Sequence, residues 1–174
     1  MNTQHPQSKN TRSMLKKIFA IAAIALSSLT ANAQFEQGKI YLNGSLTGLN
    51  LSYNGESKFN FGTQGQMGYM VADNWLLYGL VGYQHTDSSD SYSAGAGGRF
   101  YIDQNGIFLG ANCKVVHSPG YTDVMPGLEV GYAYFLSRTV TIEPAIYYDQ
   151  SFKDHSKYST IGLKVGIGVY LFND

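Results

Sequence analysis

The chain has 174 residues, a formal net charge of zero and a charged fraction of 14%. Soluble domains typically contain about 25% charged residues, so this composition argues against an ordinary surface in water. The length suits one domain. Cysteine occurs once, which excludes a disulfide framework, whereas 14 tyrosines and 20 glycines make the chain aromatic and glycine-rich, unlike most helical bundles.

The first predicted element is a secretory signal peptide. Lys16 and Lys17 precede an apolar run at 18–26, and a stretch of small residues ends at Ala33. A membrane anchor is the alternative, but this apolar run is too short to span a bilayer. We therefore expect cleavage before Gln34.

Cleavage divides the chain into an N-terminal extension with the signal peptide, 1–33, and an exported domain, 34–174. The sequence leaves open whether translation starts at Met1 or at Met14. Removal of the leader takes away four basic residues and no acidic one, namely Lys9, Arg12, Lys16 and Lys17. Eight basic residues then remain against twelve acidic ones, and the resulting charge of −4 argues against nucleic acid as a partner.

After the leader, apolar and polar residues alternate in one segment after another, which is the period of β-strands. The last segment shows it most clearly, with aliphatic residues at every odd position: Ile161, Leu163, Val165, Ile167, Val169 and Leu171. Eight strands are predicted, at about 39–53, 58–71, 75–84, 92–102, 107–117, 124–135, 139–149 and 158–172.

Two features of these strands need explanation. Both faces of 75–84 are apolar, so its facing is left open. Pro126 and Pro144 fall inside predicted strands, where each removes a donor from the hydrogen-bond ladder, and we expect local bulges or frayed strand ends there.

The connections alternate in length along the chain. Short turns follow the second, fourth and sixth strands, and longer polar loops follow the odd-numbered strands, at 53–58, 85–91, 118–123 and 150–157. Turns at one end and loops at the other are typical of an outer-membrane barrel, with the turns in the periplasm. An even number of strands places both chain ends on the periplasmic side.

The polar face of the strands holds glycines and amides rather than rows of Lys and Glu, which indicates an interior. The interior of an eight-stranded barrel is just wide enough to be filled by side chains. From Ile161 to Leu171 the strand covers about 33 Å, or about 25 Å of membrane height when tilted by about 40°. The predicted fold is therefore an all-β, eight-stranded antiparallel up-and-down transmembrane β-barrel. A soluble lipocalin-like carrier, with the apolar face inside, is the alternative.

Over residues 38–172 the chain resembles the small eight-stranded outer-membrane barrels of Gram-negative bacteria, the class containing outer membrane protein X and the membrane domain of outer membrane protein A. The resemblance rests on the leader, the hairpin layout and the segments YFLSRTVTIEPAIYY and GLKVGIGVYLF. It implies placement in the cell outer membrane, contact with outer-membrane lipid and lipopolysaccharide, a monomer, and an envelope-structural or surface-interaction role.

The last segment also resembles the terminal assembly signal of that class, which implies handling by the outer-membrane assembly machinery. The matching residues are Lys164, Gly166, Val169 and Leu171. The chain departs from the pattern by continuing past Phe172 to Asn173 and Asp174.

No cofactor or metal site is expected, and we expect a protein that is not an enzyme. The alternatives are a narrow channel and a lipid-modifying barrel enzyme of the lipid A deacylase or acyltransferase type. The enzyme would use His117 with Ser118, or His155 with Ser156, but neighbouring strand residues face opposite ways and cannot form a dyad within a strand. We interpret these histidines and His85 as solvated loop residues.

The strand parities place five charged residues inside the predicted barrel: Arg99, Lys114, Glu129, Glu143 and Lys164. Symmetry about the loop at 118–123 predicts that Lys114 and Glu129 are neighbours across two strands. We expect a buried ion-pair network that braces and plugs the barrel without a catalytic role, as the resemblance also implies. The alternative is that water in the barrel solvates each charge separately.

Overall fold

The computed structural model describes residues 35–49, 61–86, 89–102, 105–153 and 159–171. The predicted leader and its cleavage site at Gln34 lie outside the described residues, as do His155 and Ser156. The described strands are β1 (Ile40–Leu49), β2 (Phe61–Ala72), β3 (Trp75–Thr86), β4 (Ser89–Tyr101), β5 (Ile107–Ser118), β6 (Tyr121–Tyr132), β7 (Tyr134–Phe135), β8 (Val140–Asp149) and β9 (Thr160–Leu171). No helix in the described part of the chain is long and apolar enough to cross a membrane.

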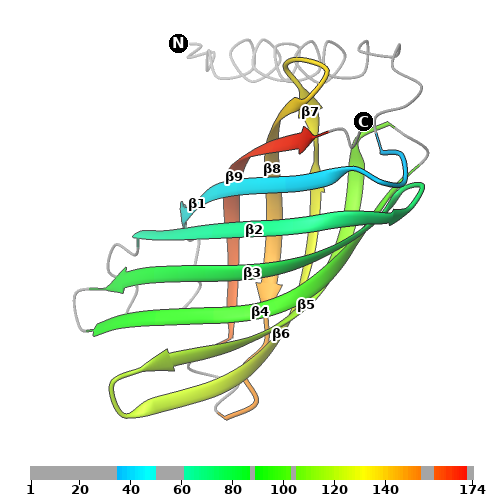
Figure 1. Ribbon diagram of the computed structural model, residues 1–174. Coiled ribbons are helices and arrows are strands. Elements are labelled where there is room, and N and C mark those ends of the chain that lie inside the picture. The colour runs from blue at the N-terminus through cyan, green and yellow to red at the C-terminus, as the bar shows by residue number, and fades with distance from the viewer. Residues whose placement is uncertain (1–34, 50–60, 87–88, 103–104, 154–158, 172–174) are drawn as a thin grey trace, which may run out of the picture. The chain divides into compact units, whose positions relative to one another are not determined.

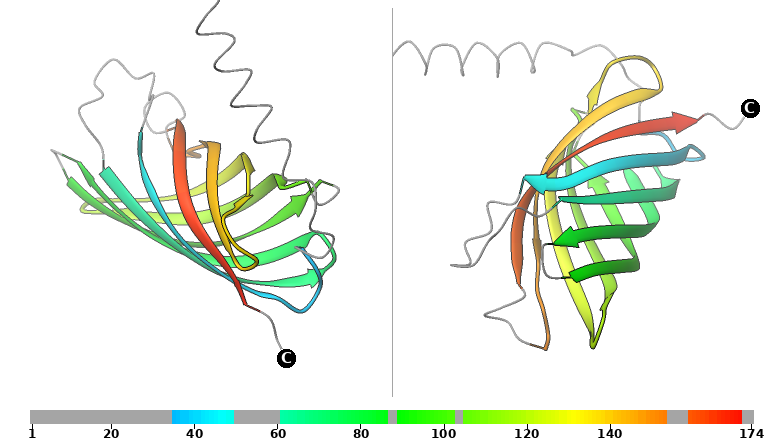
Figure 2. Two further views of the ribbon diagram at one scale, coloured as in Figure 1. Left: turned by 90° about the horizontal axis from the view of Figure 1, so that it is seen from above. Right: turned by 90° about the vertical axis from the view of Figure 1, so that its left-hand side faces the viewer.

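The strands form one antiparallel sheet that closes on itself. From β1 to β6 each strand pairs with the next, β6 and β7 pair with β8, and β8 pairs with β9. Pairing of β1 with β9, from Ile40↔Leu171 onward, completes the ring. Figure 1 shows β1 lying beside β9, and Figure 2 shows the sheet curving round an interior. The predicted up-and-down barrel is confirmed.

β6 and β7 are two parts of one barrel strand, so the barrel has the eight strands that were predicted. The pairing of β6 with β8 ends at Gly131↔Ala145, and β7 resumes it at Tyr134↔Ile142 in the same register. The interruption lies beside Pro144, which has no N–H for the ladder. Because no residue is gained or lost between the two pairs, the expectation of a bulge at Pro144 was wrong.

Pro126 lies where one ladder ends. It pairs with Cys113 of β5 without a register shift, while the pairing of β6 with β8 extends only as far as Gly127↔Asp149. The Pro126 carbonyl accepts a hydrogen bond from the Gln150 N–H at 2.8 Å. The carbonyl and the nitrogen of one strand residue point to the same side, so the missing donor faces the end of the ladder.

The two ends of the barrel differ. We call the end that carries the β2–β3, β4–β5 and β7–β8 connections the turn end, and the opposite end the loop end. At the loop end, residues 87–88 join β3 to β4, and Pro119 with Gly120 joins β5 to β6. The longer loops predicted at 85–91 and 118–123 were therefore wrong, because their polar residues continue the strands. Gly120 permits the tighter turn through its positive φ of 79°.

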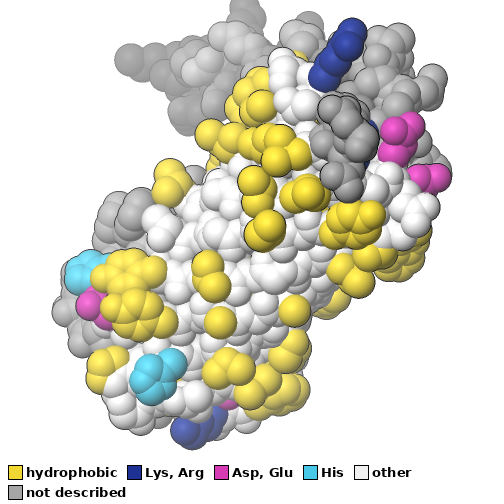
Figure 3. All heavy atoms as spheres, viewed as in Figure 1, with side chains coloured by type: hydrophobic (Ala, Val, Ile, Leu, Met, Phe, Trp, Pro, Cys, Tyr) yellow, Lys and Arg dark blue, Asp and Glu magenta, His cyan; other side chains and the backbone are white. Residues whose placement is uncertain are grey.

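The outer wall of the barrel is apolar. In β9, Val165 and Ile167 are 42% and 57% exposed, whereas Lys164, which directly precedes Val165, is 6% exposed. The aliphatic face of β9 therefore points outward. The structure also decides the facing of β3, where Leu77 and Val81 are exposed while the side chains at 76, 78 and 80 are buried. Figure 3 shows hydrophobic side chains spread along one side of the wall, with charged side chains and histidines near its ends.

Charges are nearly absent from this outer wall. Among the described strand residues, Asp90 at the loop end of β4 is the one charged side chain that faces outward, and it pairs with His85. Every other described strand residue with a charge has the same parity as the buried side chains of its strand and points into the barrel. This distribution is the reverse of that in a soluble barrel, where the outer face meets water.

An aromatic cluster fills the interior at the turn end. Its members come from five parts of the chain: Phe35, Tyr41, Tyr101, Phe108 and Tyr170. The Phe35 ring stacks on the Tyr101 ring with centroids 3.9 Å apart, and its edge meets the Tyr170 ring at 5.7 Å. Phe35 precedes β1, and its carbonyl accepts a hydrogen bond from the Asn74 N–H at 2.8 Å. The segment before the first strand therefore folds across the turn end.

Candidate functional site

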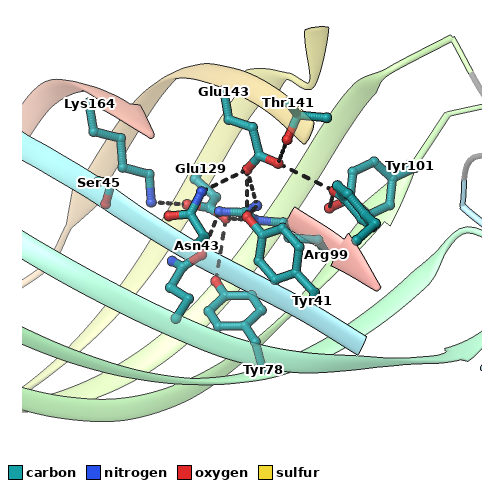
Figure 4. A network of polar contacts seen from close by, with 12 residues as sticks. Tyr41, Asn43, Ser45, Tyr78, Arg99, Tyr101, Glu129, Thr141, Glu143 and Lys164 are labelled. Atoms are coloured by element: carbon teal, nitrogen blue, oxygen red, sulfur yellow. Dashed lines mark hydrogen bonds and ion pairs between the residues drawn. The ribbon is translucent and has the colours of Figure 1, made fainter. Parts of the chain in front are cut away.

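The candidate site is a cluster of ionised side chains in the barrel interior, which we call the lumenal network (Figure 4). Its charged members are Arg99 of β4, Glu129 of β6, Glu143 of β8 and Lys164 of β9. Inward-facing polar side chains of β1, β2 and β3 complete it: Tyr41, Asn43, Gln66 and Tyr78. The network therefore connects strands that are far apart in the sequence.

Arg99 contacts both carboxylates and is 2% exposed. Its Nε donates to Glu129 Oε1 at 2.5 Å, and its Nη1 donates to Glu143 Oε2 at 2.8 Å. Further donors reach the Tyr41 hydroxyl at 2.7 Å and Gln66 Oε1 at 2.9 Å. The planar guanidinium has five N–H donors in fixed directions, so one side chain can hold two carboxylates on different strands.

Aromatic rings surround the rest of the guanidinium. The Arg99 Cζ atom lies 4.4 Å from the centroid of the Phe108 ring, 5.3 Å from that of Tyr78 and 5.4 Å from that of Tyr41. Ring faces carry partial negative charge and attract a cation, most strongly where water is excluded. The turn-end aromatic cluster and the lumenal network are therefore one continuous packed region.

Glu143 is held by neutral donors as well as by Arg99. The Tyr41 hydroxyl donates to its Oε2 at 2.5 Å, and the Thr141 hydroxyl donates to its Oε1 at 2.8 Å. Asn43 and Tyr170 contribute longer contacts of 3.3 Å each. A buried carboxylate loses its hydration shell, and these donors replace it.

Glu129 lies between two cations. Arg99 donates to its Oε1, which also accepts from the Tyr78 hydroxyl at 3.3 Å, and the Lys164 ammonium donates to its Oε2. The two cations and two carboxylates of the lumenal network balance in formal charge. Because burial of an unbalanced charge is costly, this balance is a condition for placing four ionised groups at 2% to 6% exposure.

Glycines make room for the carboxylates. A Cβ atom at Gly110 of β5 would lie 2.5 Å from Glu129 Cγ, and a Cβ atom at Gly168 of β9 would collide with the Glu143 carboxylate. At these two inner-face positions, a residue larger than glycine would collide with a buried carboxylate. The glycines that indicated an interior in the sequence therefore leave space for Glu129 and Glu143 here.

The lumenal network contains four of the five residues that the sequence placed in the interior, and Lys114 is not among them. The expected Lys114–Glu129 contact was wrong, because Lys114 pairs with Met125 and Glu129 pairs with Gly110. The two side chains are thus four residues apart along the strand, or about 13 Å. Lys114 instead donates to Asp149 Oδ2 at 2.5 Å.

Asp149 was missed by the sequence reasoning, although a signal existed. It shares the parity of Glu143 on the same strand, so it belongs to the inward face of β8. Because Asp149 is the last residue of the predicted strand, it was not counted among the residues of the barrel interior. With Asp149 included, the Lys114–Asp149 pair balances itself, and the lumenal network needs no further anion.

The histidines do not form the dyad of a lipid-modifying enzyme in the described residues. His117 Nδ1 lies 2.8 Å from Thr122 Oγ1 on the outer wall, whereas the Ser118 hydroxyl donates to the Asp90 carbonyl. His117 and Ser118 therefore point in different directions, as the strand parity predicted. The described residues also contain no group of three or more His, Cys, Asp or Glu that could hold a metal ion.

The residues of the resembled assembly signal lie in β9. Lys164 and Gly166 face inward, and Leu171 is 42% exposed on the outer wall. Their part in assembly stays a prediction.

Lys39 is the remaining buried cation at the turn end among the described residues. It precedes β1, and its Nζ lies 3.9 Å from Glu36 Oε2. Burial lowers the pKa of Lys39, and the Glu36 carboxylate opposes part of that shift.

No protein-family model and no curated protein sequence matches the chain. Solved structures with a similar fold include the N-terminal β-barrel domain of Pseudomonas aeruginosa OprF, with a TM-score of 0.61, 10% identity and coverage of 78% of this chain and 98% of that one. Neisserial surface protein A has a TM-score of 0.56 and 20% identity, covering 76% and 96%. The Yersinia pestis outer membrane protein Ail has a TM-score of 0.54 and 13% identity, covering 78% and 100%.

At these sequence identities the likeness concerns the fold. The chain has the fold of the small eight-stranded outer-membrane β-barrels, and its closed sheet and apolar outer wall agree with that fold.

Proposed function

We propose that the chain is an exported, non-catalytic integral protein of the outer membrane, with an envelope-structural or surface-interaction role. In this proposal the signal peptide is removed before Gln34, the assembly machinery inserts the barrel as a monomer, and the outer wall contacts lipid and lipopolysaccharide. The turn end then faces the periplasm and the loop end faces outward.

The observation that carries the proposal is the separation of charge and apolar surface. The described strands place one charged residue on the outer wall, Asp90 at its loop-end margin, and hold the rest inside. A wall of this kind is unstable in water and stable in hydrocarbon, where unpaired charge is costly.

A structural role is supported by the state of the interior groups. Every carboxylate of the lumenal network accepts hydrogen bonds from at least one cation, and both cations contact a carboxylate. Such groups stabilise the position of the walls. The loop-end turn that the structure describes, at Pro119 and Gly120, is short and offers little surface to a partner, which favours the envelope-structural role.

Membrane fractionation tests the proposal. The protein should accompany outer-membrane fractions, resist extraction by carbonate or urea, begin at Gln34, and change its gel mobility on heating, as folded barrels do. Recovery as a soluble periplasmic protein would refute it.

Two arginine substitutions on neighbouring positions give a matched comparison. Val81→Arg places a charge on the outer wall, where Val81 is 63% exposed, and should destabilise a membrane barrel by up to about 2 to 4 kcal/mol, less toward the interface. Ser93→Arg, on the inner face of the next strand, should be better tolerated. A soluble protein would show the opposite order.

A further inference from the structure

An apolar groove lies in the outer wall of the barrel, across strands β1 to β4. Its volume is about 670 Å³. Sites for small molecules usually measure about 300 to 1,000 Å³. We call it the wall groove and define it by six outward-facing residues, in which glycines alternate with larger apolar side chains: Leu42, Gly44, Gly65, Met67, Gly79 and Val81. None of these six residues has a polar side chain.

The glycines of the wall groove differ from those on the inner face. On the inner face, Gly97 and Gly110 are required, because a Cβ atom would come within 2.7 Å and 2.5 Å of other atoms. A Cβ atom at Gly44 would meet nothing within 4 Å, and one at Gly65 or Gly79 would have ordinary contacts at 3.8 and 3.9 Å. Packing within the chain therefore does not explain the three outer glycines, whereas close approach of a ligand to the backbone would.

The wall groove lies midway between two outward-facing aromatic pairs of β3 and β4. Toward the turn end, the Trp75 and Phe100 rings have centroids 5.0 Å apart. Toward the loop end, the Tyr83 and Tyr92 rings have centroids 5.3 Å apart. Gly79 is four residues from Trp75 and four from Tyr83, or about 13 Å along the strand in each direction. Because such aromatic residues lie at the two interfaces of a bilayer, the groove meets the hydrocarbon between them.

The floor of the wall groove requires no polar ligand. Gly44 pairs with Gly65 on one side and with Ile167 on the other, so its backbone takes part in the β-ladders of both neighbours. Gly79 likewise has a partner in β2 and in β4. Both glycines are exposed, so their backbone atoms lack van der Waals contacts on the outer side. A hydrocarbon chain would supply these contacts and leave every ladder hydrogen bond intact.

We propose that the wall groove seats one acyl chain of a membrane lipid. The proposal rests on the membrane placement proposed above and names the partner of one part of the wall. The groove is continuous with the apolar outer wall, and a lipid chain is thin enough to reach its floor. A second copy of the barrel fits less well, because two convex walls meet at their protruding side chains. Met67 and Val81, at 64% and 63% exposure, would then hold the second wall away from the glycines.

Photolabelling in lipid vesicles tests the proposal. The probe is a phosphatidylcholine with a diazirine in the middle of one acyl chain, used as a minor component of dimyristoylphosphatidylcholine vesicles. Mass spectrometry after irradiation locates the labelled residues. Leu128 of β6 is the reference, because it is 63% exposed on the outer wall and lies outside the groove. We expect Leu42 and Met67 to be labelled at least about threefold more than Leu128, a preference that even weak binding of a chain would give.

Two variants locate the site. Gly79→Leu fills the wall groove and should reduce the labelling of Leu42 and Met67 to the level of Leu128. Ala111→Leu adds apolar bulk to the outer wall of β5, outside the groove, and should leave the labelling of Leu42 unchanged. Because variant and parent are compared at the same residues, differences in the reactivity of the side chains cancel. Heat-modifiable mobility verifies that each barrel is folded.

A phosphatidylglycerol probe with the same chains should give the same pattern, because the groove contacts the chain and not the headgroup. Even labelling around the wall of an inserted barrel would overturn the groove and leave the membrane placement standing, whereas a protein that does not insert would overturn the placement itself. Labelling that is unchanged in Gly79→Leu, or that depends on the headgroup, would also contradict the proposal. Labelling of Leu42 that rises when the protein is diluted in the vesicles would replace the lipid chain by a second copy.

Discussion

At the scale of single residues, the four charges of the lumenal network are arranged so that each one contacts an opposite charge. Arg99 forms ion pairs with Glu129 and Glu143, and Lys164 forms a second ion pair with Glu129. A buried ion pair is not by itself evidence of stability, because desolvation offsets the attraction between the charges. Removal of one partner is different, since the remaining charge stays buried.

We predict that Glu129→Gln lowers the free energy of unfolding by about 3 to 5 kcal/mol, because Arg99 and Lys164 would then face a single carboxylate. Urea unfolding of the barrel in lipid vesicles measures this. The control is Asp90→Asn, which should change the stability far less, because the Asp90 side chain is 47% exposed and its partner His85 is 64% exposed. Equal losses in the two variants would show that water solvates the interior charges separately.

A second prediction concerns the partner of Lys114. A double-mutant cycle of Lys114→Met with Asp149→Asn should show coupling of about 0.5 to 3 kcal/mol, because the two groups are in contact. The cycle of Lys114→Met with Glu129→Gln should show almost none. Reversed magnitudes would restore the partner that the sequence predicted.

The contacts of Glu129 and Lys114 show which features of the interior could be predicted from the sequence. The direction of a side chain depends on its parity along the strand, and parity tolerates errors in strand boundaries of two residues. All five charged residues therefore face inward as expected. The choice of partner depends on register, which the turn at Pro119 and Gly120 sets, and the sequence suggested a longer loop there.

At the scale of elements, the segment before β1 acts as part of the barrel although it is not a strand. Gly38 donates to the Met70 carbonyl at 2.9 Å, and Phe35 is fully buried in the turn-end aromatic cluster. No periodic pattern marks this segment, because its place depends on tertiary contacts alone. The interruption between β6 and β7 had a sequence signal in Pro144, but its form depended on the neighbouring strand.

We predict that Phe35→Ala lowers the free energy of unfolding by about 3 to 5 kcal/mol, the usual cost of truncating a buried phenylalanine. The midpoint temperature of the heat-dependent mobility change should fall accordingly. Phe152→Ala provides the control, because Phe152 is 70% exposed and its truncation should change stability by less than about 0.5 kcal/mol. An unchanged midpoint in Phe35→Ala would mean that the segment is not part of the folded barrel.

At the scale of the whole molecule, two successive layers obstruct the barrel interior. The turn-end aromatic cluster closes one end, and the lumenal network lies against it through Arg99 and Phe108. Toward the loop end, the inward-facing residues Gln64, Ser93 and Asn112 are partly exposed.

We predict that the purified monomer forms no open diffusion pore in planar lipid bilayers. Lumen width grows with strand number, and eight strands leave space that side chains fill. Phe35→Ala should remain closed as well, because truncating one ring leaves the lumenal network in place beneath it. The double variant Phe35→Ala with Arg99→Ala opens both layers and should conduct if it folds, which heat-modifiable mobility checks. Large and stable conductance steps from the unmodified monomer would contradict the two-layer closure, and would favour the narrow-channel alternative over a structural barrel.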